Sequence, residues 1–246
     1  MNKTANRNDT EAQHPDRHTT VGVLGGMGPD ATLTFMQRVI DATPAEDDIE
    51  HVHMLVDNNP KVPSRIKALI EGTGESPGPT IAAMARRLEQ AGTDFLVMPC
   101  NTAHYYWQDA QEAVDIPVWH IVAMTLDEVV RQAPGAKVGM LCSPALRKIG
   151  LYENFIEERG LSLLYPEDEA PVLEVIRAVK RGQGHHDETL AAFTRAADEL
   201  QHRGADVLVL ACTELSVIRD GLTTQIPVVD SVQVLAEGVA AAAEGR

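Results

Sequence analysis

Cysteine and aromatic residues are scarce in this chain of 246 residues. It contains 3 cysteines, and aromatic side chains make up 4% of the sequence. Cys100, Cys142 and Cys212 are far apart and form no C-x-x-C pair, so the sequence indicates neither a zinc ribbon nor a disulfide framework. We therefore expect free thiols, as in a reducing cytoplasm.

Long apolar runs and an excess of positive charge are lacking as well. The longest apolar stretches fall well short of the ~18–20 residues that a membrane-spanning helix needs, and no signal peptide is recognisable. The formal net charge of -15 argues against a nucleic-acid surface. We expect a cytoplasmic protein that binds a small molecule, with neither membrane nor nucleic acid as a partner.

The beginning of the chain lacks a complete nucleotide-binding motif. Residues 1–19 are polar without apolar periodicity, which predicts a disordered tail. An apolar strand at 20–24, a glycine turn at 25–29 and a helical pattern at 30–42 follow, and this order opens a doubly wound α/β fold. The glycines do not match G-x-G-x-x-G and no P-loop lysine follows, so a dinucleotide site is only weakly indicated.

Two stretches of the sequence, 92–102 and 204–214, match each other closely. Each begins with Gly-x-Asp, continues with an apolar run of buried-strand length, and places a cysteine eight residues after the glycine. The neighbouring elements recur too. An apolar strand at 137–142 resembles the opening strand, and Ile-Pro-Val follows each cysteine, at 116–118 and at 226–228. The sequence therefore predicts a duplicated unit.

The remaining elements follow from apolar periodicity and turn residues. Further strands are expected at 51–56, 116–121 and 226–230, and further helices at 80–91, 152–159, 174–181, 189–201 and 232–243. We infer two similar α/β halves related by a pseudo-two-fold axis: 20–121, with 226–246 packing back on it, and 122–225. Because the carboxyl ends of parallel strands gather at one edge of a sheet, Cys100 and Cys212 should face each other across a cleft.

Two facing thiols admit several functions. A single cysteine nucleophile, with His104 or His120 as its base, would indicate acyl transfer but leaves the second matched cysteine unexplained. A redox disulfide is a further alternative, against which the cytoplasmic setting argues. Two thiols could also remove a proton from a carbon next to a carboxylate and return one to its opposite face. A strand end before a helix N-terminus favours thiolate, whereas Cys142, without a matched partner, is interpreted as structural.

Cations that could bind a carboxylate occur in the loop at 57–65. Its two prolines and two asparagines predict a loop at the carboxyl end of a strand, where open α/β sheets bind ligands. Lys61 and Arg65 are the candidates, because an arginine fork matches the plane of a carboxylate.

Six motifs in order along the chain resemble the aspartate/glutamate racemases that are independent of pyridoxal phosphate. They are GVLGGMGP at 22–29, NNP at 58–60 with PSR at 63–65, PCNTAH at 99–104, GLY at 150–152, VKRG at 179–182 and ACTEL at 211–215. The resemblance runs from about residue 20 to the end of the chain. It implies two Rossmann-like α/β/α halves with the active site between them, no cofactor, no metal, and a homodimer.

The resemblance also implies the roles of individual residues. Cys100 and Cys212 would be the paired acid/base residues. The substrate-binding positions would be Asn101, Thr102 and Thr213 for the α-carboxylate, Arg65 and Lys180 for the side-chain carboxylate, and Met27, Asn59 and Ser143 elsewhere in the pocket.

The chain departs from the family pattern after the strand at 137–141. Many members have Ala-Thr-x-Gly-Thr there, whereas this chain has CSPAL at 142–146. Ser143 keeps a hydroxyl, but Leu146 replaces the later threonine, which leaves open the choice among aspartate, glutamate and a broader range. We expect a racemase for aspartate and/or glutamate, because both cysteines are kept. The alternative is a lyase, decarboxylase or isomerase with a single essential cysteine.

Overall fold

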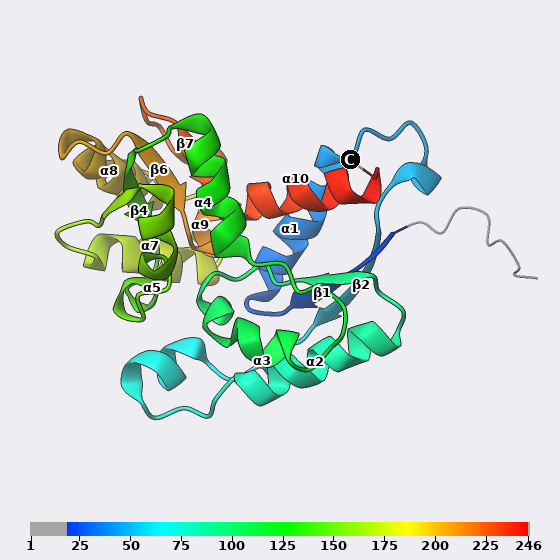
Figure 1. The fold of residues 1–246 in the computed structure, drawn as a ribbon. Helices are drawn as coiled ribbons and strands as arrows, with labels where there is room; N and C mark the ends of the chain where they lie inside the picture. The colour runs from blue at the N-terminus through cyan, green and yellow to red at the C-terminus, as the bar shows by residue number, and fades with distance from the viewer. Residues whose placement is uncertain (1–18, 246) are drawn as a thin grey trace, which may run out of the picture.

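The computed structural model describes residues 19–245, and in this part of the chain the strands form two parallel sheets (Figure 1). The first sheet has the order β2-β1-β3 and consists of β1 (Thr20–Gly25), β2 (His53–Asn58) and β3 (Phe95–Val97). The second has the order β5-β4-β6-β7 and consists of β4 (Lys137–Leu141), β5 (Ser162–Leu164), β6 (Val207–Leu210) and β7 (Val228–Asp230). The predicted α/β class with two similar halves is confirmed.

The two sheets repeat each other strand by strand. The arrangement β5-β4-β6 reproduces β2-β1-β3, and the Ile-Pro-Val motif lies beside the cysteine strand in both halves. Leu96 N donates to Pro117 O at 2.8 Å, and Leu208 N donates to Pro227 O at 2.9 Å. In the first half this contact is only an isolated bridge, so the strand predicted at 116–121 is shorter than expected. The reason is that a helix already begins at Ile121.

The repeated Gly-x-Asp sets the register of each cysteine strand. The glycine ends the preceding helix with φ of 90° in the first half and 86° in the second, values that glycine adopts without strain. The aspartate then pairs with the first residue of the central strand. Thr20 N donates to Asp94 Oδ2, and Lys137 N donates to Asp206 Oδ2, both at 2.8 Å. The aspartate N–H returns a bond to the same residue, Asp94 N to Thr20 O and Asp206 N to Lys137 O, again at 2.8 Å.

The helices form one inner group between the sheets and two outer groups. The inner helices are α1 (Pro29–Ala42), α4 (Ile121–Gln132) and α10 (Ser231–Ala243). The outer helices are α2 (Gly78–Gln90) and α3 (Trp107–Gln111) over the first sheet, and α7 (Ala170–Lys180) and α8 (Asp187–His202) over the second. Short helices follow several strands: α5 (Pro144–Lys148), α6 (Glu153–Ile156), α9 (Thr213–Val217), a π-helical turn at Lys67–Glu71, and 3-10 turns at Asp48–Glu50, Thr102–Tyr106, Glu157–Arg159 and Arg219–Gly221.

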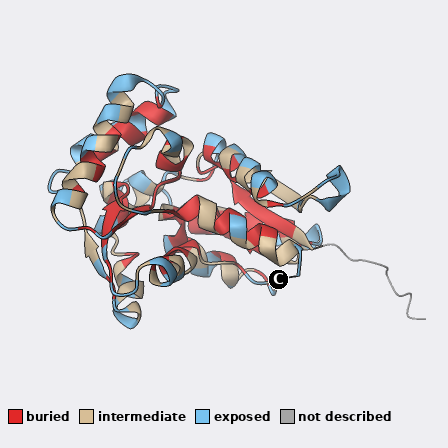
Figure 2. Ribbon diagram, turned by 90° about the horizontal axis from the view of Figure 1, so that it is seen from above, coloured by how far each residue is buried: buried red, intermediate tan, exposed pale blue. Residues whose placement is uncertain are grey.

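The central core is shared between the halves. Strand side chains alternate between this core and the outer layers: Val21 and Val209 face inward, while Leu96 and Leu208 face the outer helices. Figure 2 shows the buried residues on the strands and on the inward faces of the helices. The inner core therefore joins both sheets into one structure.

The C-terminal segment divides between the two halves. Strand β7 joins the second sheet, whereas α10 packs against α1 of the first half and α4. The division into 20–121 and 122–225 stays a prediction, and the predicted tail, apart from residue 19, lies outside the described residues. Among residues 19–245, no helix combines the length and apolarity that crossing a bilayer requires.

Candidate active site

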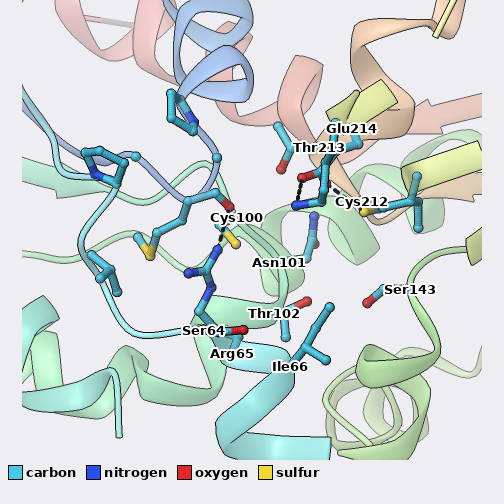
Figure 3. Close-up of a pocket in the computed structure, with 18 of the residues that line it drawn as sticks. Ser64, Arg65, Ile66, Cys100, Asn101, Thr102, Ser143, Cys212, Thr213 and Glu214 are labelled. Carbon is cyan, nitrogen blue, oxygen red and sulfur yellow. Dashed lines mark hydrogen bonds and ion pairs between the residues drawn. The ribbon is translucent and has the colours of Figure 1, made fainter. Parts of the chain in front are cut away.

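A cleft of about 450 Å³ lies at the carboxyl ends of strands from both sheets (Figure 3). Its size is in the range of small-molecule sites. Most lining residues belong to the loops and first helical turns that follow β1, β2, β3, β4 and β6, and two belong to α7. The first group is Gly26, Met27, Gly28, Pro29, Pro60, Val62, Ser64, Arg65, Ile66, Cys100, Asn101, Thr102, Ser143, Ala211, Cys212, Thr213 and Glu214, and the residues from α7 are Ile176 and Lys180. The structure thus brings Cys100 and Cys212 to one cleft, as the duplication predicts. Cys142 is buried in the shared core and is not among these residues.

Cys100 is buried and lies three residues after the end of β3. The ring of His104 fixes its main chain. Its carbonyl oxygen accepts a hydrogen bond from His104 Nδ1 at 2.9 Å, and His104 Nε2 accepts one from Ile121 N at 3.1 Å. Burial, aided by nearby His120, lowers the pKa of His104 to about 3. A neutral ring with both nitrogens engaged supports the chain around Cys100 and does not act as a base for acyl transfer.

Cys212 lies between β6 and α9, and its thiol is bound to a carboxylate. Cys212 Sγ donates to Glu214 Oε2 at 3.0 Å. Burial raises the pKa of Cys212 well above its ordinary value, and the negative charge of Glu214 raises it further. The thiolate that we expected from the helix N-terminus is therefore not favoured at Cys212. Desolvation and a like charge outweigh the helix, so this thiol holds its proton.

Glu214 also pairs with Lys180, which projects from α7. Lys180 Nζ lies 2.6 Å from Glu214 Oε1. Burial alone would raise the pKa of Glu214, but the Lys180 ammonium, together with hydrogen bonds from Cys212 and the backbone, holds it below its usual value. Burial would likewise lower the pKa of Lys180, and Glu214 raises it instead. Sequence reasoning did not single out Glu214, although its place two residues after a matched cysteine was an available signal.

Arg65 reaches the cleft from the loop after β2 and is braced by backbone carbonyls. Arg65 Nη2 donates to Met27 O at 3.0 Å, and Nη1 donates to Pro63 O at 3.2 Å. Met27 borders the cleft, as predicted. Asn59 and Lys61 are not among the lining residues: Asn59 Oδ1 accepts from Lys61 N at 3.0 Å. The Asn59 backbone instead packs behind the glycine turn.

The four remaining predicted hydroxyl and amide residues line the cleft, and they differ in whether their polar groups are already hydrogen-bonded to the protein. Thr102 and Ser143 border it. The Thr213 hydroxyl donates to Pro99 O at 3.0 Å, so it is engaged with the protein. Asn101 is buried, and both ends of its amide bond to other side chains. Among residues 19–245, there is no cluster of three or more His, Cys, Asp or Glu side chains that could hold a metal ion.

Known proteins are similar to this chain in sequence and in architecture. Residues 24–239 match the family model described as Asp/Glu/Hydantoin racemase. The broad specificity amino-acid racemase RacX of Bacillus subtilis (strain 168) is 29% identical over 231 residues, which cover 88% of this chain and 95% of that protein. The solved aspartate racemase of Picrophilus torridus has a TM-score of 0.81 and 30% identity over 92% of this chain and 94% of its own.

More distant structures share the fold alone. An aspartate racemase homologue from Pyrococcus horikoshii OT3 has a TM-score of 0.70 at 20% identity, over 92% of this chain and 99% of its own. The family match covers most of the chain and includes both halves. The chain therefore belongs to the Asp/Glu/hydantoin racemase family and is an enzyme of the amino-acid racemase type.

Proposed function

We propose that this enzyme interconverts the enantiomers of aspartate and/or glutamate without a cofactor, with Cys100 and Cys212 as a pair of acid/base groups. One observation carries the proposal: two cysteines just beyond equivalent strands of two equivalent sheets line the same cleft. A single nucleophile would need only one of them. Removal of a proton on one face of the α-carbon and delivery on the other uses both.

The proton states of the site favour one order of events. Cys212 holds its proton, so in the proposed order Cys100 is the base that removes the α-proton, and the electron pair of the broken C–H bond passes to the α-carbon and the adjoining carboxylate. The Cys212 thiol would then donate its proton to the opposite face and become the thiolate. Reaction of the other enantiomer runs in reverse.

The α-carbanion needs hydrogen-bond donors aimed at the α-carboxylate, which is usually the largest stabilising contribution in such sites. In the proposal these donors are the Thr102 hydroxyl and the backbone N–H groups of residues 101, 102 and 213. Arg65 and Lys180 would bind the side-chain carboxylate. Because Lys180 already pairs with Glu214, the substrate would share this ammonium with the protein.

Isotope exchange tests the proposal. Each enantiomer of aspartate and glutamate is incubated in D₂O, and chiral chromatography with mass spectrometry follows α-deuteration. We expect deuterated product of inverted configuration, and a loss of roughly 10²–10⁴-fold in Cys100→Ser and in Cys212→Ser. The control is Cys142→Ser, which changes the buried cysteine outside the cleft and should racemise normally. Full activity in both cleft variants refutes the two-thiol mechanism. Activity that survives the loss of one cysteine points to the single-cysteine alternative.

We also propose a homodimer, on the basis of the family resemblance, that works in the cytoplasm, on the basis of its three free cysteines. Sedimentation velocity at the concentration of the activity assay checks the first part. A single species of one-chain mass would contradict it.

A further inference from the structure

The short segment that carries Cys100 is attached to the second half on both of its sides. On one side, Thr213 Oγ1 donates to Pro99 O at 3.0 Å. On the other, Tyr152 Oη donates to Asn101 Oδ1 at 2.8 Å, and Asn101 Nδ2 donates to Ser231 Oγ at 2.8 Å. All three partners belong to elements that follow residue 121 in the chain.

These contacts lead to the chain around the opposite thiol. Thr213 is the residue after Cys212. Ser231 Oγ donates onward to Leu210 O at 2.8 Å, and Leu210 is the last residue of β6, two residues before Cys212. The segment around Cys100 is therefore connected twice to the segment around Cys212, once through Pro99 and once through Asn101.

The side chains that make the connection through Asn101 are buried, and their polar groups are hydrogen-bonded to one another. Tyr152 and Ser231 are fully buried, and Asn101 is 2% exposed. Burial raises the pKa of Tyr152, so its phenol stays protonated and can donate. An unmade hydrogen bond at such a buried site costs about 1–3 kcal/mol, so the geometry is strongly maintained. Both ends of the Asn101 amide are hydrogen-bonded to these partners, although the residue borders the cleft.

We propose that Tyr152, Ser231 and Thr213 are positioning residues that fix the separation of the two thiols by holding residues 99–101, and that the Asn101 side chain is the anchor of this attachment. The inference rests on the proposed two-thiol racemisation and adds to it two residues, Tyr152 and Ser231, from outside the substrate-contacting set. Tyr152 and Ser231 do not line the cleft.

Separation matters because both thiols must lie close to one carbon, on its opposite faces. Reacting atoms lie about 3–3.5 Å apart in a productive complex, and a displacement of about 1 Å can reduce a rate by about 10²-fold. If Cys100 takes the proton and Cys212 is displaced, protonation by Cys212 is slower and the carbanion has a longer lifetime. Cys100 then exchanges its proton with solvent and returns a deuteron to the same face. Loosening the attachment thus slows inversion more than it slows exchange with retained configuration.

Tyr152→Phe removes one hydroxyl from the attachment and keeps the ring. In D₂O, initial rates of inversion and of deuteration in the recovered enantiomer are measured from both enantiomers. We expect inversion to fall by about 10-fold, the ratio of retained to inverted deuterated molecules to rise by at least about threefold, and KM to change by less than about twofold. A variant that is merely less folded loses both rates in proportion, so its ratio does not change.

Tyr165→Phe is the matched control. It removes a phenol from the same half, where Tyr165 Oη donates to Glu153 Oε1 at 2.8 Å without any bond to Asn101. Its ratio should equal that of the wild type. Ser231→Ala is the second test variant and should raise the ratio as Tyr152→Phe does, which keeps the test decisive if one of the two fails to fold.

The outcomes separate this inference from the function on which it rests. Normal α-deuteration by the wild type, with unchanged ratios in Tyr152→Phe and Ser231→Ala, would overturn the positioning role alone. A wild type that deuterates neither enantiomer would overturn the proposed function and this inference together. A raised ratio in the two variants and not in Tyr165→Phe establishes the positioning role.

Discussion

The substitution Glu214→Gln tests how the charge of Glu214 affects the Cys212 thiol, because it removes that charge and nearly preserves the shape of the side chain. The amide has nearly the same size as the carboxylate and can still accept a hydrogen bond from Cys212. It removes the negative charge that lies beside the thiol and leaves the Lys180 ammonium without its partner. Both changes favour the thiolate, so the pKa of Cys212 should fall.

The size of the fall follows from the geometry. Two like charges at the 3.0 Å that separates Cys212 Sγ from Glu214 Oε2 repel by roughly 5 kcal/mol at an effective dielectric constant of about 20. This corresponds to about 4 pKa units. Lys180, 2.6 Å from the other carboxylate oxygen, is present in both proteins, so its attraction for the thiolate does not reduce this difference. We therefore expect the pKa of Cys212 to fall by about 4 units in the variant.

Alkylation gives a direct measurement. Wild type and Glu214→Gln are treated with iodoacetamide from about pH 5 to about pH 10, since only the thiolate reacts, and the labelled Cys212 peptide is quantified by mass spectrometry. The control is Glu128→Gln, which breaks a surface ion pair with Arg131 on α4 and should leave the Cys212 profile unchanged. A rate of Cys212 labelling in Glu214→Gln that equals the wild-type rate throughout this pH range would refute the electrostatic explanation.

Three further predictions concern stability, measured as the free energy of unfolding in urea. Arg38→Met removes the cation 2.6 Å from buried Asp230 and should lower stability by about 3 kcal/mol, and a loss below about 1 kcal/mol would contradict the buried ion pair. His104 has its pKa lowered to about 3 in the folded state, so the unfolded chain binds the extra proton. Stability should be complete above about pH 7 and fall by about 2 kcal/mol on acidification to about pH 5, and His104→Gln should weaken this dependence; equal slopes in both proteins would exclude His104 as its source. Asp94→Ala and Asp206→Ala should each cost about 1 kcal/mol, and clearly unequal losses would argue against equivalent roles.

Local signals in the sequence were enough to predict the architecture. Gly-x-Asp followed by an apolar run recurs because the same turn and the same strand pairing are built twice. The helices at 30–42, 189–201 and 232–243 were found because one apolar face of each is buried. Strand β5 was missed because its three residues are only partly buried and leave a weak pattern.

The polar contacts of the site were beyond local reasoning. Asn101 meets Tyr152 and Ser231, which are 51 and 130 residues away in the chain, so no spacing rule connects them. The raised pKa of Cys212 depends on burial, and burial is a property of the assembled core. A neighbouring residue type can suggest a contact, as Glu214 does beside Cys212, but only the fold shows whether water is excluded from it.

The shared inner core has a consequence for synthesis on the ribosome. Side chains of α1, such as Phe35 and Val39, are buried in the same cluster as Leu235 and Val239 of α10, which the ribosome makes much later. Domains generally fold in order as they emerge, at about 5–20 residues per second. The apolar face of α1 therefore lacks its partner until α10 emerges. A nascent chain halted before Ser231 should expose that face to chaperones and proteases, so the first half matures only after the second has been made.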